Sequence, residues 1–183
     1  MVYILLGEGF EEIEAIAPLD ILRRADIEVA TVALSNELLV NGGHDIKVEA
    51  DISLEQIDFE KLDMLVLPGG LGGVKSISES PAAMDLIQKT WNAKKKLAAI
   101  CAAPTLLAKL GLLKGLNVTC YPTVGDVIED AGGCFKTDPV IRDGDMVTGQ
   151  AAGASIEFGL EIVAVLRDRE TAEQLRKSLI YNV

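Results

Sequence analysis

The feature that most constrains the fold is the alternation of short, wholly apolar runs with helix-like segments. Residues 2–6 (VYILL), 64–67 (MLVL) and 97–100 (LAAI) are apolar throughout, which is typical of strands buried on both faces of a parallel sheet. Residues 11–24 and 80–95 carry apolar side chains at helical spacing. Because parallel strands need helical, right-handed crossovers, the pattern predicts an α/β fold with a doubly wound, mostly parallel sheet sandwiched by helices.

The remaining elements follow the same alternation. We expect further strands at 27–34, 45–50 (nearer an edge), 116–120, 138–142 and 145–149, and further helices at 104–111, 153–166 and about 169–179. The chain has 183 residues and no linker, repeat or charge block that would divide it. We therefore expect a single domain spanning residues 1–183.

The composition of the chain argues against certain binding partners and indicates the cellular compartment. The chain has 17 Lys and Arg against 28 Asp and Glu, a net charge of −11, which argues against binding nucleic acid or an anionic membrane surface. The N-terminal apolar run has no basic leader, and no apolar stretch approaches the ~20 residues that span a bilayer. A soluble cytoplasmic protein is the expectation. With three widely spaced cysteines and His44 as the only histidine, we expect no disulfide framework, no metal and no cofactor.

Cys101 stands where an apolar strand turns into a helix. The segment Ala99-Ile100-Cys101-Ala102-Ala103 has small residues two positions either side of the cysteine, as the sharp turn of a nucleophile elbow requires. A thiol at a helix N-terminus is expected to have a lowered pKa. The alternative is a buried structural cysteine.

Two other segments leave predicted neighbouring strands and are expected to meet Cys101 at the carboxyl edge of the sheet. Pro68-Gly69-Gly70 follows residues 64–67, and its backbone N–H groups, with that of Ala102, are suited to an oxyanion hole. The alternative is an ordinary tight turn.

Acidic residues begin the segment that follows the first strand. Glu11, Glu12 and Glu14 lie in the first turn of the expected helix, where carboxylates usually complement the helix dipole on a solvated face. We expect two of them to do so and one to turn inward. An inward carboxyl would keep a proton, have a raised pKa and stabilise a neighbouring thiolate.

Together these segments resemble the ThiJ/PfpI superfamily, in the branch of the parkinsonism-associated protein deglycase. The motifs EGFEEIEA, LPGGLGG, AAICAAPTLLA, TCYP and AAGASIEFGL follow one another in that order and cover essentially the whole chain. The resemblance implies a flavodoxin-like fold similar to class I glutamine amidotransferases, a homodimer, and a reactive, oxidisable cysteine. It assigns that cysteine to Cys101, its protonated glutamate partner to Glu14, and the backbone donors to Gly70 and Ala102.

The chain also departs from the superfamily's pattern. Many members carry a histidine before the proline of the T-x-x-P segment, where this chain has Tyr121. A phenol is a poor base at neutral pH, so base chemistry would fall to a carboxylate or water. The hydrolase-like branch has a histidine directly after the cysteine, and Ala102 at that position disfavours peptidase activity. Glu11, Gly69, Tyr121 and Gly153 are expected to line the pocket.

Three functions remain open from the sequence. In the first, Cys101 attacks a small dicarbonyl such as methylglyoxal, or its adduct, as a deglycase or cofactor-free glyoxalase. In the second, Cys101 is a redox sensor or part of a chaperone-like protein and is oxidised to a sulfinate. The third is a small-molecule binding module with an ordinary cysteine. We expect His44 to decorate a turn and Cys120 and Cys134 to pack in the core, with a resolving partner for Cys101 as their alternative role.

Overall fold

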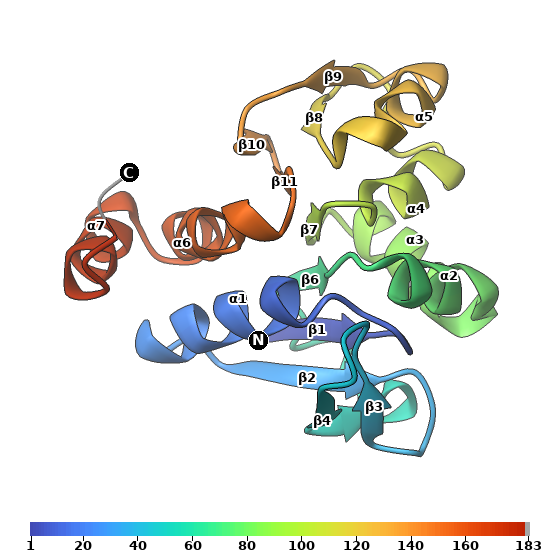
Figure 1. Cartoon of the computed structure of the whole chain (residues 1–183), viewed down its shortest axis with the longest axis horizontal. Helices are drawn as coiled ribbons and strands as arrows, with labels where there is room; N and C mark the ends of the chain where they lie inside the picture. Colours follow the sequence, from blue (N-terminus) through green and yellow to red (C-terminus); the bar gives the residue numbers. More distant parts are fainter. Residues whose placement is uncertain (182–183) are drawn as a thin grey trace.

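The computed structural model describes residues 1–181, which form a central seven-stranded sheet (Figure 1). Its strand order is β10-β11-β7-β6-β1-β2-β5, and every neighbouring pair is parallel except β10 with β11. The strands are β1 (Val2–Leu6), β2 (Val29–Ala33), β5 (Ile52–Ser53), β6 (Met64–Leu67), β7 (Lys96–Ile100), β10 (Val140–Asp143) and β11 (Met146–Gly149). The predicted doubly wound, mostly parallel sheet is confirmed.

Helices cover both faces of this sheet, which explains why its central strands are apolar throughout. In Figure 1, α1, α6 and α7 lie on the left of the sheet, and α2 to α5 lie on its right. The first group is α1 (Glu12–Arg24), α6 (Ser155–Leu166) and α7 (Arg169–Ser178); the second is α2 (Leu71–Glu79), α3 (Pro81–Asn92), α4 (Pro104–Lys109) and α5 (Gly125–Asp130). Each layer buries its own hydrophobic core against one face of the sheet.

Two small sheets lie outside the central one and correct two expectations. β3 (Leu39–Asn41) and β4 (Lys47–Glu49) form an antiparallel hairpin, so the strand expected at 45–50 is not an edge of the main sheet. β8 (Asn117–Thr119) pairs with β9 (Cys134–Lys136), so the strand expected at 116–120 also lies apart. Short 3-10 turns occur at Leu54–Gln56, Pro122–Val124 and Ala152–Ala154.

Two helices were absent from the sequence expectations. α2 begins LGG and α5 is the six-residue segment GDVIED; glycine and aspartate have low helix propensity, and neither segment is long enough to show a clear apolar repeat. Each helix buries one isoleucine, Ile77 of α2 and Ile128 of α5, in the same hydrophobic core, which is the tertiary stabilisation that short helices depend on.

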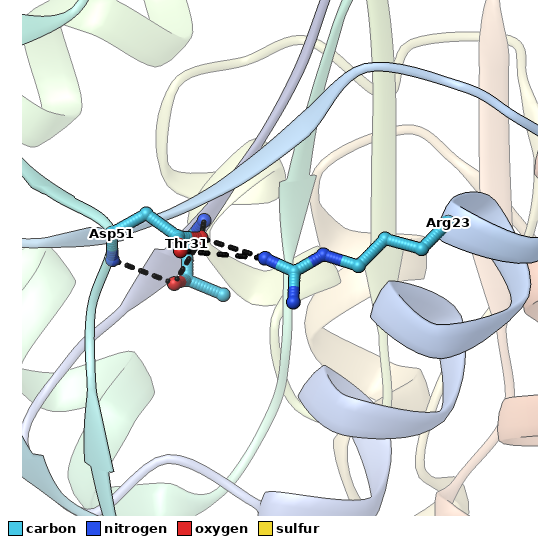
Figure 2. Close-up of polar contacts among 3 residues, drawn as sticks. All are labelled: Arg23, Thr31 and Asp51. Atoms are coloured by element: carbon cyan, nitrogen blue, oxygen red, sulfur yellow. Dashed lines mark hydrogen bonds and ion pairs between the residues drawn. The ribbon is translucent and has the colours of Figure 1, made fainter.

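The C-terminal end of α1 is tied to the sheet by a polar network (Figure 2). Asp51 Oδ2 accepts hydrogen bonds from the backbone N–H and the hydroxyl of Thr31 at 2.8 and 2.9 Å. Arg23, in the last turn of α1, donates to both carboxylate oxygens of Asp51 at 3.3 and 3.1 Å. The buried Thr31 therefore has its polar groups satisfied at the edge of the sheet.

Among the helices of residues 1–181, none is long and apolar enough to cross a bilayer.

Candidate active site

Three loops meet at the carboxyl ends of β1, β6 and β7, which are adjacent strands. The backbone N–H of Gly69 donates to Glu14 Oε2 at 2.8 Å, and the N–H of Glu11 donates to the Gly69 carbonyl at 3.0 Å. A Cβ atom on Gly69 would lie 2.5 Å from Glu14 Oε2 and 2.7 Å from the Cβ of Cys101. Only glycine fits at this position, because the carboxyl and the cysteine approach the backbone from two sides.

Cys101 occupies a strained turn, as a nucleophile elbow does. Its φ is +63°, in a region that non-glycine residues enter at a cost of about 1–3 kcal/mol. Backbone hydrogen bonds hold the turn: the N–H of Cys101 donates to the Gly149 carbonyl at 3.0 Å, and its carbonyl accepts from the N–H of Tyr121 at 2.8 Å. The residue as a whole is partly exposed.

Glu14 is the carboxylate that turns inward. It is 1% exposed, and its Oε1 is buried without a hydrogen-bond partner among the described residues. Burial raises the pKa of Glu14 to about 7, and the charge of Glu11 adds to the rise, while hydrogen bonding to Cys101 and Gly69 opposes it. Glu14 therefore exchanges a proton near neutral pH, in the range that general acid–base chemistry requires.

The expected lowering of the Cys101 pKa is not supported. Burial, the neighbouring charge of Glu14 and the hydrogen bond to Glu14 together raise the pKa of Cys101 to about 12. α4 has only six residues, and its N-terminus does not offset burial. When Glu14 is ionised the proton stays on the sulfur, so a thiolate forms only as Glu14 takes that proton.

The two backbone donors oppose the rise in the Cys101 pKa. The N–H groups of Ala102 and Gly70 act to lower the pKa of Cys101, although by less than burial raises it. Gly70 has a φ of +84°, a conformation that glycine adopts freely. Two donors beside a nucleophile are the arrangement that stabilises an oxyanion.

Glu12 does not lie on a solvated face, contrary to expectation. It is 5% exposed, and its Oε1 and Oε2 accept hydrogen bonds from the backbone N–H of His44 at 2.7 Å and from the His44 Nδ1 at 2.9 Å. Burial acts to raise the pKa of Glu12, but these hydrogen bonds prevail and leave it below its ordinary value. Two of the three glutamates therefore turn inward.

His44 lies in a turn, as expected, but it has specific partners there. Its Nδ1 also lies 3.7 Å from Glu11 Oε1, and one ligand atom from each of Glu11, Glu12 and His44 falls within 4.8 Å of the others. Three groups are fewer than the four ligands of a structural zinc site, so the expectation of no metal stays a prediction. The ion pairs within the group account for its geometry. No sequence pattern indicated this contact, because Glu12 and His44 are 32 residues apart.

Comparison with known proteins identifies the family. The family model described as DJ-1/PfpI matches residues 1–165. The chain belongs to the DJ-1/PfpI family. It is 36% identical over 177 residues to Protein dj-1beta of Drosophila melanogaster, covering 97% of this chain and 95% of that protein. The crystal structure of that protein superposes with a TM-score of 0.94 at 35% identity, over 100% of this chain and 98% of the other.

Two other DJ-1 proteins are similar over nearly the whole chain. The glutathione-independent glyoxalase DJ-1 of Schizosaccharomyces pombe is 28% identical over 185 residues, covering 97% of each chain. A solved structure described as Toxoplasma gondii DJ-1, oxidized, has a TM-score of 0.93 at 29% identity and covers 100% of this chain and 98% of that chain. These similarities establish the flavodoxin-like fold of the DJ-1/PfpI family.

The other candidate residues differ in how close they lie to the Cys101–Glu14 pair. Tyr121 is bonded to Cys101 through its backbone, and the residue is 45% exposed. Gly153 is exposed, with no atom within 4 Å of the place its Cβ would take, so nothing here ties it to the pair. Their role in lining a pocket stays a prediction.

The other two cysteines give mixed results. Cys120 is fully buried in the core on the α2–α5 side, as expected, whereas Cys101 packs against the core on the opposite side of the sheet. Cys134 is exposed, so the expectation that it packs in the core is wrong. It lies on β9, a strand of the small outer sheet, where one face meets solvent.

Proposed function

We propose that this protein is a cysteine-dependent, cofactor-free enzyme that acts on small dicarbonyls or their adducts, as a glyoxalase or deglycase, in the response to carbonyl stress. The observation that carries the proposal is Glu14, a carboxyl whose pKa is raised to about 7 and whose Oε1 has no other partner, beside the Cys101 thiol. The name of the S. pombe relative, a glutathione-independent glyoxalase, supports the same chemistry.

The first step transfers the thiol proton to Glu14. Ionised Glu14 accepts the proton of Cys101 while the sulfur forms a bond to the aldehyde carbon of methylglyoxal and the carbonyl π electrons move to oxygen. The N–H groups of Gly70 and Ala102 stabilise the oxyanion. The proton on Glu14 then neutralises it, which gives a hemithioacetal.

The later steps shift two protons, one from carbon to carbon and one from oxygen to oxygen, and consume one water. Glu14 removes the proton from the former aldehyde carbon, an enediol forms, and the neighbouring carbon is protonated, which gives a thioester of a 2-hydroxy acid. Water cleaves the thioester, releasing lactate and restoring the thiol. The net reaction is methylglyoxal plus water to lactate, so no external oxidant, metal or cofactor is needed. Because Glu14 serves as the base, the absence of a histidine at Tyr121 does not block any step.

The test is the rate of methylglyoxal loss and lactate formation with the wild type and with Cys101→Ser. We expect the variant to lose at least 100-fold in kcat/KM. A Cys134→Ser variant is the matched control, because it removes an exposed thiol and should retain full activity. Equal rates for Cys101→Ser and the wild type would refute the proposal.

A second candidate function is redox sensing by the same cysteine. A protonated Glu14 Oε1, which has no partner in the reduced protein, is placed to donate a hydrogen bond to a sulfinate on Cys101. The Toxoplasma neighbour described as oxidized is consistent with this reading. Mild peroxide followed by peptide mass spectrometry tests it: oxidation of Cys134 before Cys101 would count against a sensor.

We further propose a homodimer, as the family resemblance implies. Four large apolar residues of α1 and the β3–β4 hairpin are unusually exposed: Ile13 (55%), Ile16 (37%), Leu39 (54%) and Ile46 (56%). Such residues on two adjoining elements are typical of an interface. Sedimentation of the wild type and of Ile13→Glu tests this, and a monomeric wild type would refute it.

A further inference from the structure

The only histidine of the chain, His44, does not contact the proposed reactive pair but contacts two glutamates that are close to Glu14 in sequence. His44 is on the turn between β3 and β4, and this turn packs on the N-terminal end of α1. Its backbone N–H and its Nδ1 both bind Glu12, and its Nδ1 lies 3.7 Å from Glu11 Oε1. A surface histidine that decorates a turn would not need two carboxylate partners on another element.

Backbone contacts of the neighbouring residues hold the His44–Glu12 contact in place. The N–H of Gly43 donates to the Phe10 carbonyl at 2.8 Å, and Phe10 forms an isolated β-bridge with Gly42. A Cβ on Gly42 would lie 2.2 Å from Glu12 Oε1, so the turn closes directly over that carboxylate. Folding therefore fixes His44 against the two glutamates.

Glu11 connects the His44–Glu12 contact to the Cys101–Glu14 pair. Its backbone N–H is bonded to the carbonyl of Gly69, whose own N–H holds Glu14. The charge of Glu11 also raises the pKa of Glu14. Any group that neutralises Glu11 therefore changes how readily Glu14 ionises, and His44 is the cationic group that contacts it.

We propose that His44 is a positioning residue for the Cys101–Glu14 pair, acting through Glu11 and Glu12 as a positive charge that favours the ionised form of Glu14. The inference rests on the proposed function, because it assumes that Glu14 takes the Cys101 proton. It assigns a role to a residue that stands apart from the T-x-x-P segment, where Tyr121 replaces the histidine of other members.

The surroundings of His44 favour its charged form. The hydrogen bond to Glu12 raises the pKa of His44, and the charges of Glu11, Glu12 and Asp45 raise it further, against a small opposing effect of burial. Asp45 belongs to the same turn, and Glu11 and Glu12 to the start of α1. As pH rises through the His44 pKa, the positive charge is lost, Glu11 repels Glu14 more strongly, and the Glu14 proton is held to higher pH.

The test is the pH profile of Cys101 alkylation by iodoacetamide, followed by peptide mass spectrometry in a Cys134→Ser background with EDTA throughout. His44→Asn keeps a donor near Glu12 but carries no charge. We expect the midpoint of the Cys101 alkylation profile in this variant to lie roughly 0.3–0.5 pH units above that of the wild type. This is the effect of one partly solvated charge several ångströms away. His44→Arg, which restores the charge, should return the midpoint to the wild-type value or below it.

The control is Glu49→Gln, an exposed change on the same hairpin that should leave the midpoint in place. Equal midpoints for wild type and His44→Asn, with folding verified by urea unfolding, would overturn the inference. So would a difference that is seen in a parallel series without EDTA but not in the series with EDTA, because it would assign the effect to a bound metal ion. If Glu14→Gln also leaves the profile unchanged, the reactive pair itself is refuted, and with it the proposed function.

Discussion

Two carboxylates are used in opposite ways: Glu14, in the first turn of α1, and Asp51, which the last turn of α1 contacts through Arg23. Near the N-terminus of α1, Glu14 accepts one backbone hydrogen bond through Oε2 and leaves Oε1 buried without a partner. At the other end of the helix, Asp51 accepts from Thr31 and Arg23 through four contacts of 2.8–3.3 Å. Both oxygens of Asp51 are occupied (Figure 2), whereas one oxygen of Glu14 is free to exchange a proton.

The difference indicates that Asp51 has a structural role and Glu14 a reactive one. A buried polar atom without a partner costs about 1–3 kcal/mol, and a fold accepts that cost most readily where it provides reactivity. A satisfied carboxylate stabilises the fold but cannot accept a proton without losing a bond. Substitutions at the two ends of α1 should therefore affect different properties.

Glu14→Gln should produce the largest effect. The amide has the same shape but cannot accept the Cys101 proton, so we expect kcat/KM for methylglyoxal to fall by about 10²–10⁴-fold, as for loss of a general base. Asp51→Asn is the matched change at the other end of α1 and should leave activity within twofold. Steady-state kinetics at pH 7 check both variants. A comparable loss in the two variants would show that Glu14 is not the reactive carboxylate of the pair.

The stability of Glu14→Gln should also change with pH relative to the wild type. Because the folded-state pKa of Glu14 is raised from 4.5 to about 7, its contribution is fully present below pH 4.5 and is lost as pH rises toward 7. At about 1.4 kcal/mol per pH unit, the variant should gain roughly 3 kcal/mol over the wild type between pH 4 and 8. Urea unfolding across that range measures the gain. Parallel pH profiles for the two proteins would contradict the raised pKa.

These predictions rest on features that the sequence reveals unequally. The central sheet was predictable because 2–6, 64–67 and 97–100 are wholly apolar, and a strand covered on both faces has no other pattern. Since adjacent parallel strands end at one edge, the meeting of Gly69 with Glu14 and Cys101 was predictable too.

What the sequence missed depends on burial and on contacts distant in the chain. The rise in the Cys101 pKa comes first from burial, a quantity that local sequence does not contain. The Glu12–His44 contact joins a helix start to a hairpin turn 32 residues away. No spacing rule connects these two elements, and a glutamate in a first helical turn is ordinarily solvated.

Asp51→Ala should lower stability without affecting the site. It leaves the backbone N–H and the hydroxyl of buried Thr31 without their acceptor, and we expect the free energy of unfolding to fall by about 1–3 kcal/mol. Urea unfolding at pH 7 measures the loss. Cys101 alkylation at the same pH should be unchanged, and a slower alkylation would show that the two ends of α1 are coupled.

The smallest effect is expected for Arg23→Met, which tests how the Asp51 network divides between buried and exposed contacts. Arg23 reaches Asp51 from solvent, with both side chains about half exposed, and pairs of this kind contribute about 0.2–1 kcal/mol. Methionine keeps most of the apolar stem while removing the charge. The Thr31 contacts remain, so the loss should be less than half that of Asp51→Ala and should shrink further in 0.5 M NaCl. A loss as large as that of Asp51→Ala would mean that Arg23, and not Thr31, is the partner that fixes Asp51. Asp51 would then be held mainly by an exposed ion pair. It would differ from Glu14 in how exposed its partner is, and not in how many partners it has.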